Sequence, residues 1–151
     1  MDALRQTLIQ DHESLRALYE EVLDALRSRG CDAAKPALTL FVTQLRRHFR
    51  DEEERIFPAI EQAALDPSFP QTAGLRRSHQ VFRKLLTEVQ HDVEGDLREA
   101  AIGDLSELNA SLRVHQAMEE RLVEAVEKVL PRHGAVVSSS SIGLDSEDKP
   151  E

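Results

Sequence analysis

Hydrophobic residues recur at spacings of three and four along four long segments of the chain, and this period is typical of amphipathic helices. The first segment covers about residues 3–28, and Gly30 follows it as a natural helix stop. The second covers about residues 36–65 and begins at Pro36, a residue suited to the first turn of a helix. Pro58 lies inside this segment without a backbone donor, so we expect a kink or an early end there.

The third and fourth segments cover about residues 72–93 and 97–130, and no stretch alternates convincingly with the period of a strand. Four helices joined by short connections predict an all-α protein, an antiparallel up-down four-helix bundle. We expect residues 1–134 to form one domain. The polar, serine-rich residues 135–151 are expected to be a disordered tail.

Charge and composition exclude several classes of partner. Of the 151 residues, 31% are charged, and the net charge of -9 disfavours binding to nucleic acid or to an anionic membrane surface. The amino-terminal residues lack the apolar run of a secretion signal, and no apolar segment is long enough to span a bilayer. The single cysteine, Cys31, cannot form an internal disulfide, so we expect a cytoplasmic protein.

An internal repeat places histidine on the apolar face of each helix. His12 and His48 are 36 residues apart, as are His79 and His115. An offset of 67 residues relates the two halves and also maps Glu52 onto Glu119. The chain therefore reads as two helical hairpins, each carrying a histidine and then a His-x-x-x-Glu motif.

Residues four apart lie on the same side of a helix, so each glutamate should point inward beside its histidine. Removing an unpaired carboxylate from water costs several kcal/mol, and a bound cation offsets this cost. A metal pair held by these residues is the interpretation that we favour, and the alternative is a core of hydrogen-bonded histidines without metal. Glu53 and Glu120 follow one residue later, at ~140° from the histidines, and are expected to be solvated.

The stretches DHESL, HFRDEEERIFP, SHQVF and HQAMEERL, in this order, resemble the hemerythrin-like (HHE cation-binding) family over residues 8–126. The resemblance implies two iron ions per chain in a four-helix bundle, bridged by carboxylate and by oxo or hydroxo groups. It assigns six metal ligands: His12, His48, Glu52, His79, His115 and Glu119. Imidazole and carboxylate also accept zinc and manganese, so the residues alone leave those metals open.

One departure from the family pattern bears on function. Oxygen-carrying hemerythrins usually have a further histidine where this chain has Arg83, and their second carboxylate is commonly at the position of Glu120. This difference argues against simple reversible oxygen storage. We favour a protein that binds or senses iron and small oxidants such as O₂, peroxide or nitric oxide, and no catalytic residue is assigned. The alternatives are a di-iron enzyme, peroxide-consuming, iron-oxidising or donating iron for cluster repair, and a metal-free interaction module.

Three further interpretations concern single residues. Tyr19, which lies further along the same stripe as His12, is either a hydrogen-bond partner for an imidazole or a core residue. Arg16 and Arg83 follow histidines by one turn and are expected either to pair with carboxylates at the edge of the core or to extend into water.

Overall fold

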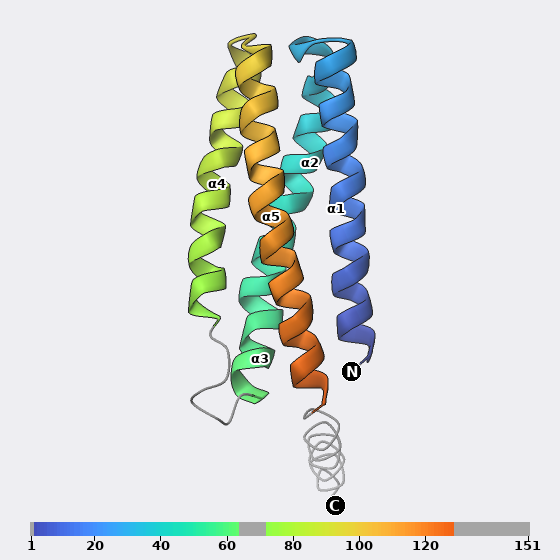
Figure 1. Cartoon of the computed structure of the whole chain (residues 1–151), viewed down its shortest axis with the longest axis vertical. Coiled ribbons are helices and arrows are strands. Elements are labelled where there is room, and N and C mark those ends of the chain that lie inside the picture. Colours follow the sequence, from blue (N-terminus) through green and yellow to red (C-terminus); the bar gives the residue numbers. More distant parts are fainter. Residues whose placement is uncertain (1, 64–71, 129–151) are drawn as a thin grey trace, which may run out of the picture.

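The computed structural model describes residues 2–63 and 72–128, and these residues are helical without any strand. The helices are α1 (Asp2–Ser28), α2 (Cys31–Asp51), the π-helical turn η1 (Glu52–Ile56), α3 (Phe57–Ala63), α4 (Ala73–Glu94) and α5 (Arg98–Glu127). In Figure 1, α2, η1 and α3 follow one another as a single rod, so the chain builds four rods side by side. The predicted four-helix bundle is thereby confirmed.

Most of the packing joins neighbouring rods. Helix α1 contacts α2 and α5, α4 contacts α5 and α2, and α3 at the end of the second rod also contacts α5. The two hairpins, α1 with α2 and α4 with α5, therefore meet along two further interfaces. Residues on the inner face of one hairpin lie opposite those of the other (Figure 1).

The second rod differs from the sequence prediction at both prolines. Helix α2 begins at Cys31 and contains Pro36 in its interior, so the predicted start was too late. The expected irregularity near Pro58 is present, but it lies in the turn before the proline. There the N–H group of Phe57 donates to the carbonyl of Glu52, one residue further back than in an α-helix. The wider turn accommodates the missing donor of Pro58 while the rod continues into α3.

Two residues with positive φ end the long helices. Gly30 has φ 97° between α1 and α2, where a side chain would be strained, and its N–H group donates to the carbonyl of Ala25. Between α4 and α5 the left-handed residue is Asp96, with φ 59°. Aspartate tolerates this conformation better than most residues, and the tight turn lets α5 fold back directly along α4.

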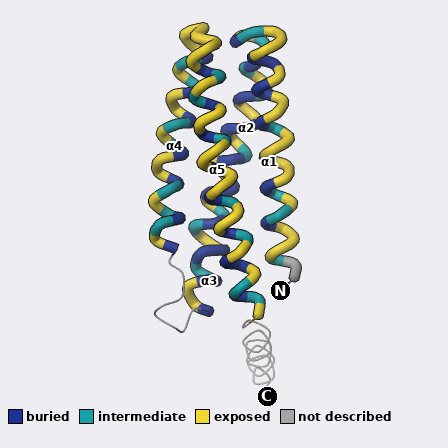
Figure 2. Tube along the Cα trace, viewed as in Figure 1, coloured by how far each residue is buried: buried dark blue, intermediate teal, exposed yellow. Residues whose placement is uncertain are grey.

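The apolar core is divided into two clusters. The larger fills the end of the bundle near the α1–α2 turn and contains Leu15, Leu45, Phe49, Phe82 and Leu112 among others. The smaller contains Leu8, Ile56, Phe57, Leu75 and Leu122 among others and lies towards the opposite end. Figure 2 shows buried positions along the inner faces of all four rods. The buried residues between the two clusters are polar, and they form the candidate site.

The proposed disordered tail, residues 135–151, lies outside the described residues. Within the described part, the helices are too polar for any of them to cross a membrane.

Candidate metal centre

A layer of histidine and glutamate crosses the bundle between the two apolar clusters. It contains every ligand predicted from the sequence: His12, His48, Glu52, His79, His115 and Glu119. Both glutamates are 0% exposed, and the four imidazoles are buried as well. The structure thus brings all six predicted residues together, with one histidine from each long helix and the two carboxylates from the second rod and α5.

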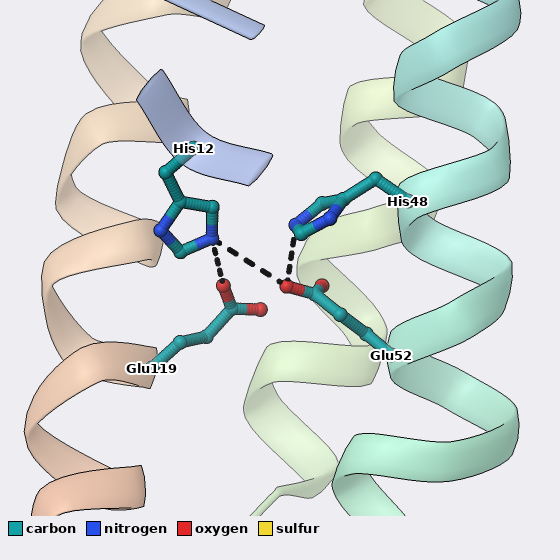
Figure 3. A group of neighbouring side chains, drawn as sticks. All are labelled: His12, His48, Glu52 and Glu119. Carbon is teal, nitrogen blue, oxygen red and sulfur yellow. Dashed lines mark hydrogen bonds and ion pairs between the residues drawn. The ribbon is translucent and has the colours of Figure 1, made fainter. Parts of the chain in front are cut away.

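Four of these residues form the first group of possible donor atoms, drawn in Figure 3. Nε2 of His12 lies 3.1 Å from Oε1 of Glu119 and 3.7 Å from Oε2 of Glu52. Nε2 of His48 lies 2.7 Å from the same Glu52 oxygen. The two imidazole rings meet edge to face with their centroids 5.0 Å apart, so His12 and His48 face each other within the first hairpin.

The second group repeats the arrangement with the other two histidines and the same pair of glutamates. Nε2 of His79 lies 2.9 Å from Oε1 of Glu52, and Nε2 of His115 lies 2.6 Å from Oε2 of Glu119. These ring centroids are also 5.0 Å apart. Each glutamate therefore directs one oxygen towards each pair of histidines, which is the arrangement that a bridging carboxylate requires.

The donor atoms form two groups, each of which could hold a cation. Within each group, one ligand atom from every residue lies within 4.8 Å of all the others. Several buried atoms also lack hydrogen-bond partners among the described residues, including Oε2 of Glu52, Oε2 of Glu119 and Nε2 of His48. The Glu52 and His48 atoms are close without being aligned for a hydrogen bond. Donor atoms that converge on a common point without satisfying one another leave a favourable position for a cation.

Without a metal, protons on the imidazoles compensate the buried carboxylates. Burial opposes protonation of His12, but hydrogen bonds to Glu119, Glu52 and Glu120 outweigh it and raise the pKa of His12 to about 10. Burial likewise opposes protonation of His115, and Glu119 and Glu52 raise its pKa to about 9. A metal ion that binds here must therefore displace protons.

The two carboxylates differ in their tendency to ionise. Burial favours the neutral form of Glu52, but contacts with four histidines outweigh burial and hold its pKa well below the ordinary value. Burial raises the pKa of Glu119, His115 and His12 oppose this, and the charge of Glu52 adds to it, so the net pKa is raised. Two carboxylates that share one buried space resist ionising together unless cations are present.

The outer nitrogens of two histidines are bound by carboxylates that the sequence prediction had assigned to solvent. Nδ1 of His12 lies 2.8 Å from Oε2 of Glu120, and Nδ1 of His79 lies 2.5 Å from Oε2 of Glu53. A carboxylate can only accept here, so Nδ1 carries the proton and Nε2 faces the centre. The prediction that Glu53 and Glu120 are solvated holds only in part, because each side chain is partly exposed and also contacts a histidine. Glu53 and Glu120 each follow a residue that points into the core, so they face a neighbouring helix. From this position each side chain reaches a histidine of that helix.

The interpretation of Arg83 as a partner for a carboxylate at the edge of the core is confirmed. Its guanidinium group lies 3.1 Å from Oε2 and 3.2 Å from Oε1 of Glu53. Arg16, the corresponding residue of the first half, forms no ion pair with Glu120 in the described part of the chain, although both line one surface pocket. The Nδ1 atoms of His48 and His115 have no hydrogen-bond partner among the described residues. They differ in nearby charge, because Oδ2 of Asp11 lies 3.6 Å from Nδ1 of His48, too far for a hydrogen bond but within ion-pair distance.

Aromatic side chains fix the plane of one imidazole. The ring of His79 stacks on Phe49 at 4.3 Å between centroids and on Phe57 at 5.5 Å. Tyr19 instead packs against Phe41 in the larger apolar cluster, so its interpretation as a core residue holds.

The sequence did contain a signal for the contacts of Glu53 and Glu120, because the offset of 67 residues also maps Glu53 onto Glu120.

Comparison with protein families gives one match that covers most of the chain. The family model described as the hemerythrin HHE cation binding domain matches residues 3–126. The matched range includes all six residues of the polar layer. Searches of the curated proteins and of the solved structures gave no match to this chain.

Proposed function

The chain belongs to the hemerythrin HHE cation-binding family, and from this premise we propose that it is a non-haem di-iron protein that binds or senses iron and small oxidants. The observation that carries the proposal is the pair of donor groups that share Glu52 and Glu119. In this proposal His12 and His48 would hold one ion, His79 and His115 would hold the other, and Glu52 and Glu119 would be ligands of both.

Iron is the metal that suits both the ligands and the family. Imidazole and carboxylate donors bind iron, manganese and zinc, and each ion would have two histidines and two shared carboxylates. Four protein donors leave coordination positions for water or a small ligand. Iron, when bound, supplies the electrons for chemistry with O₂, peroxide or nitric oxide.

The protein itself contributes orientation and exclusion of water. Hydrogen bonds to Glu120 and Glu53 fix which nitrogen of His12 and of His79 faces the ions. The larger apolar cluster covers one side of the layer with Leu15, Leu45, Phe82 and Leu112, and the smaller cluster covers the other side. A site buried in this way excludes bulk water from the bound ions and any ligand on them.

The surroundings favour a ligand of few atoms over a large substrate. Three surface grooves each have one of the four histidines in their lining, namely His48, His12 and His115. None of these three grooves is lined by Glu52 or Glu119. A large organic molecule in any of them would remain separated from the bridging carboxylates by an imidazole. Binding or sensing of diatomic molecules and peroxide is therefore favoured over turnover of a large substrate.

Metal analysis of protein purified without oxygen tests the proposal. We expect close to two irons per chain and near-ultraviolet absorption that increases when air is admitted. Repeated consumption of peroxide or ferrous ions beyond one equivalent per site would indicate an enzyme instead of a binding protein. Metal-free protein whose melting temperature is unchanged in His48→Ala would contradict the proposal, because the polar layer would then be ordinary core.

A further inference from the structure

The two halves of the repeat place different charges around the outer nitrogens of the histidines. In the first half, His12 contacts Glu120 and His48 lies near Asp11, and neither carboxylate has an arginine or lysine within ion-pair distance in the described part of the chain. In the second half, His79 contacts Glu53, which Arg83 neutralises.

The fourth outer nitrogen, Nδ1 of His115, has no carboxylate within ion-pair distance among the residues that the structure describes. The residue that corresponds to Asp11 is Ser78, and its hydroxyl donates to the carbonyl of Gly74 in its own helix. The histidines of the first half thus face two carboxylates that form no ion pair with a described arginine or lysine, whereas those of the second half face one carboxylate that is paired with a guanidinium.

The grooves beside His48 and His115 show the same divergence. The groove between α1 and α2 beside His48 is lined by Asp11, Arg47 and Asp51 among others. The corresponding positions in the groove between α4 and α5 beside His115 are Ser78, Val114 and Met118. Arg47 lies in the first groove but is not within ion-pair distance of Asp11 among the described residues. The groove beside His48 therefore carries charged side chains at positions where the groove beside His115 carries neutral ones.

A carboxylate that accepts a proton from the outer nitrogen of a ligating histidine makes the other nitrogen a stronger donor to a metal. A nearby guanidinium weakens this effect because it withdraws charge from the carboxylate. We propose that the two ion positions are unequal: the position formed by His12 and His48 binds a divalent cation more tightly and is filled first. This inference rests on the proposed function, since it assigns the order in which that centre is loaded.

Stepwise titration of the metal-free, full-length protein with Co²⁺, followed by calorimetry and visible absorption, tests this order. Two successive steps are expected even in a symmetric centre, because the first ion repels the second, so substitutions are needed to assign them. Asp11→Ser gives the first half the residue of the second. It should weaken the first step by less than the ~10-fold typical of losing a hydrogen-bonded outer partner, because Asp11 acts on His48 through its charge alone, and it should have little effect on the second step. Ser78→Asp makes the reverse exchange and should strengthen the second step.

A second pair of matched variants assigns each step to its half. Glu120→Gln should weaken the first step, and the corresponding Glu53→Gln should weaken the second. Glu20→Ser removes the same charge as Asp11→Ser from an exposed position of α1 and should change neither step. Circular dichroism melting checks that each variant is folded.

The outcomes separate the inference from the function on which it depends. If Asp11→Ser and Glu120→Gln weaken only the second step, or behave like Glu20→Ser, the proposed order is wrong although the protein binds metal. If the unaltered protein binds no Co²⁺ and no iron, the proposed function itself is wrong.

Discussion

Nδ1 of His12, in the first helix, lies 2.8 Å from a carboxylate oxygen of Glu120, in the last helix. The contact joins residues 108 positions apart in the chain, and its counterpart between His79 and Glu53 joins the same two hairpins in the opposite direction. Both contacts connect a proposed ligand of one hairpin to a carboxylate of the other. The orientation of the imidazoles therefore depends on correct docking of the two hairpins.

Substitution of a shared carboxylate should disable both ion positions at once. Glu52→Gln removes a charged donor from both groups. Metal affinity should fall by more than the ~10–100-fold typical of losing an outer partner of a ligand. Metal content after gel filtration measures the loss. Glu54→Gln, an exposed change in the same turn, is the control and should retain the metal of the unaltered protein. Equal metal content in the two variants would show that Glu52 is not a ligand.

Metal removal should destabilise the bundle. A cation that binds only the folded chain adds about 2.7 kcal/mol of stability when its free concentration is ~100 times Kd. For a chain of this size, that increment is worth roughly 5–10 °C in Tm. Calorimetry of iron-loaded protein before and after chelation measures the difference. If chelator leaves the Tm unchanged while iron is shown to leave, binding contributes nothing to folding stability.

The metal-free protein should lose stability as the pH rises. The pKa of His12 is raised to about 10 and that of His115 to about 9 in the folded state. Both would titrate near 6.5 when unfolded. Protonation of a group with a raised folded pKa favours the folded state, so this contribution is complete below pH 6.5 and declines as the pH increases towards 10.

Urea unfolding of chelated protein between pH 6 and pH 10 measures this effect, and the midpoint should fall across the range. Metal-loaded protein should resist the fall, because metal affinity increases as the competing protons leave. A flat profile for the metal-free protein would show that the imidazoles are not protonated in the folded state.

Removal of the ring that stacks on His79 should be costly. Phe49 is 0% exposed and also stacks on Phe82, so Phe49→Ala leaves a cavity beside the polar layer. We expect a loss of about 3–5 kcal/mol in the free energy of unfolding, measured by urea denaturation. Val81→Ala, at an exposed position of α4, should cost less than about 0.5 kcal/mol. A comparable loss in both variants would mean that burial of Phe49 is not what stabilises this region.

The sequence was sufficient to predict the bundle and the convergence of the six polar residues. Helical period defines which residues face inward, and the offset of 67 residues places corresponding residues at the same depth in the two hairpins. His12 and His48 therefore meet, as do His79 and His115. The start of α2 was harder to predict from the sequence. Proline is typical of the first turn of a helix, but α2 already begins at Cys31, before Pro36.

The contacts of Glu53 and Glu120 could not be derived from the period of a single helix. Angular position says only that a residue points away from the inward face, and whether it meets solvent or a neighbouring helix depends on how closely the rods approach. Arg83 forms an ion pair with Glu53, whereas Arg16 forms none with Glu120 among the described residues, and this difference likewise depends on the distance between helices. Side chains that reach between helices depend on tertiary distances that no single segment encodes.

The sharing of Glu52 and Glu119 has a consequence for the two hairpins as units. Each hairpin supplies three of the four donor residues of one group, and the other hairpin supplies the fourth. Neither half is a complete binding unit, and two copies of one half facing each other would supply the same set of donors. A single-hairpin ancestor could thus have assembled this centre only as a homodimer, and duplication with fusion would have made the exchange of carboxylates permanent within one chain.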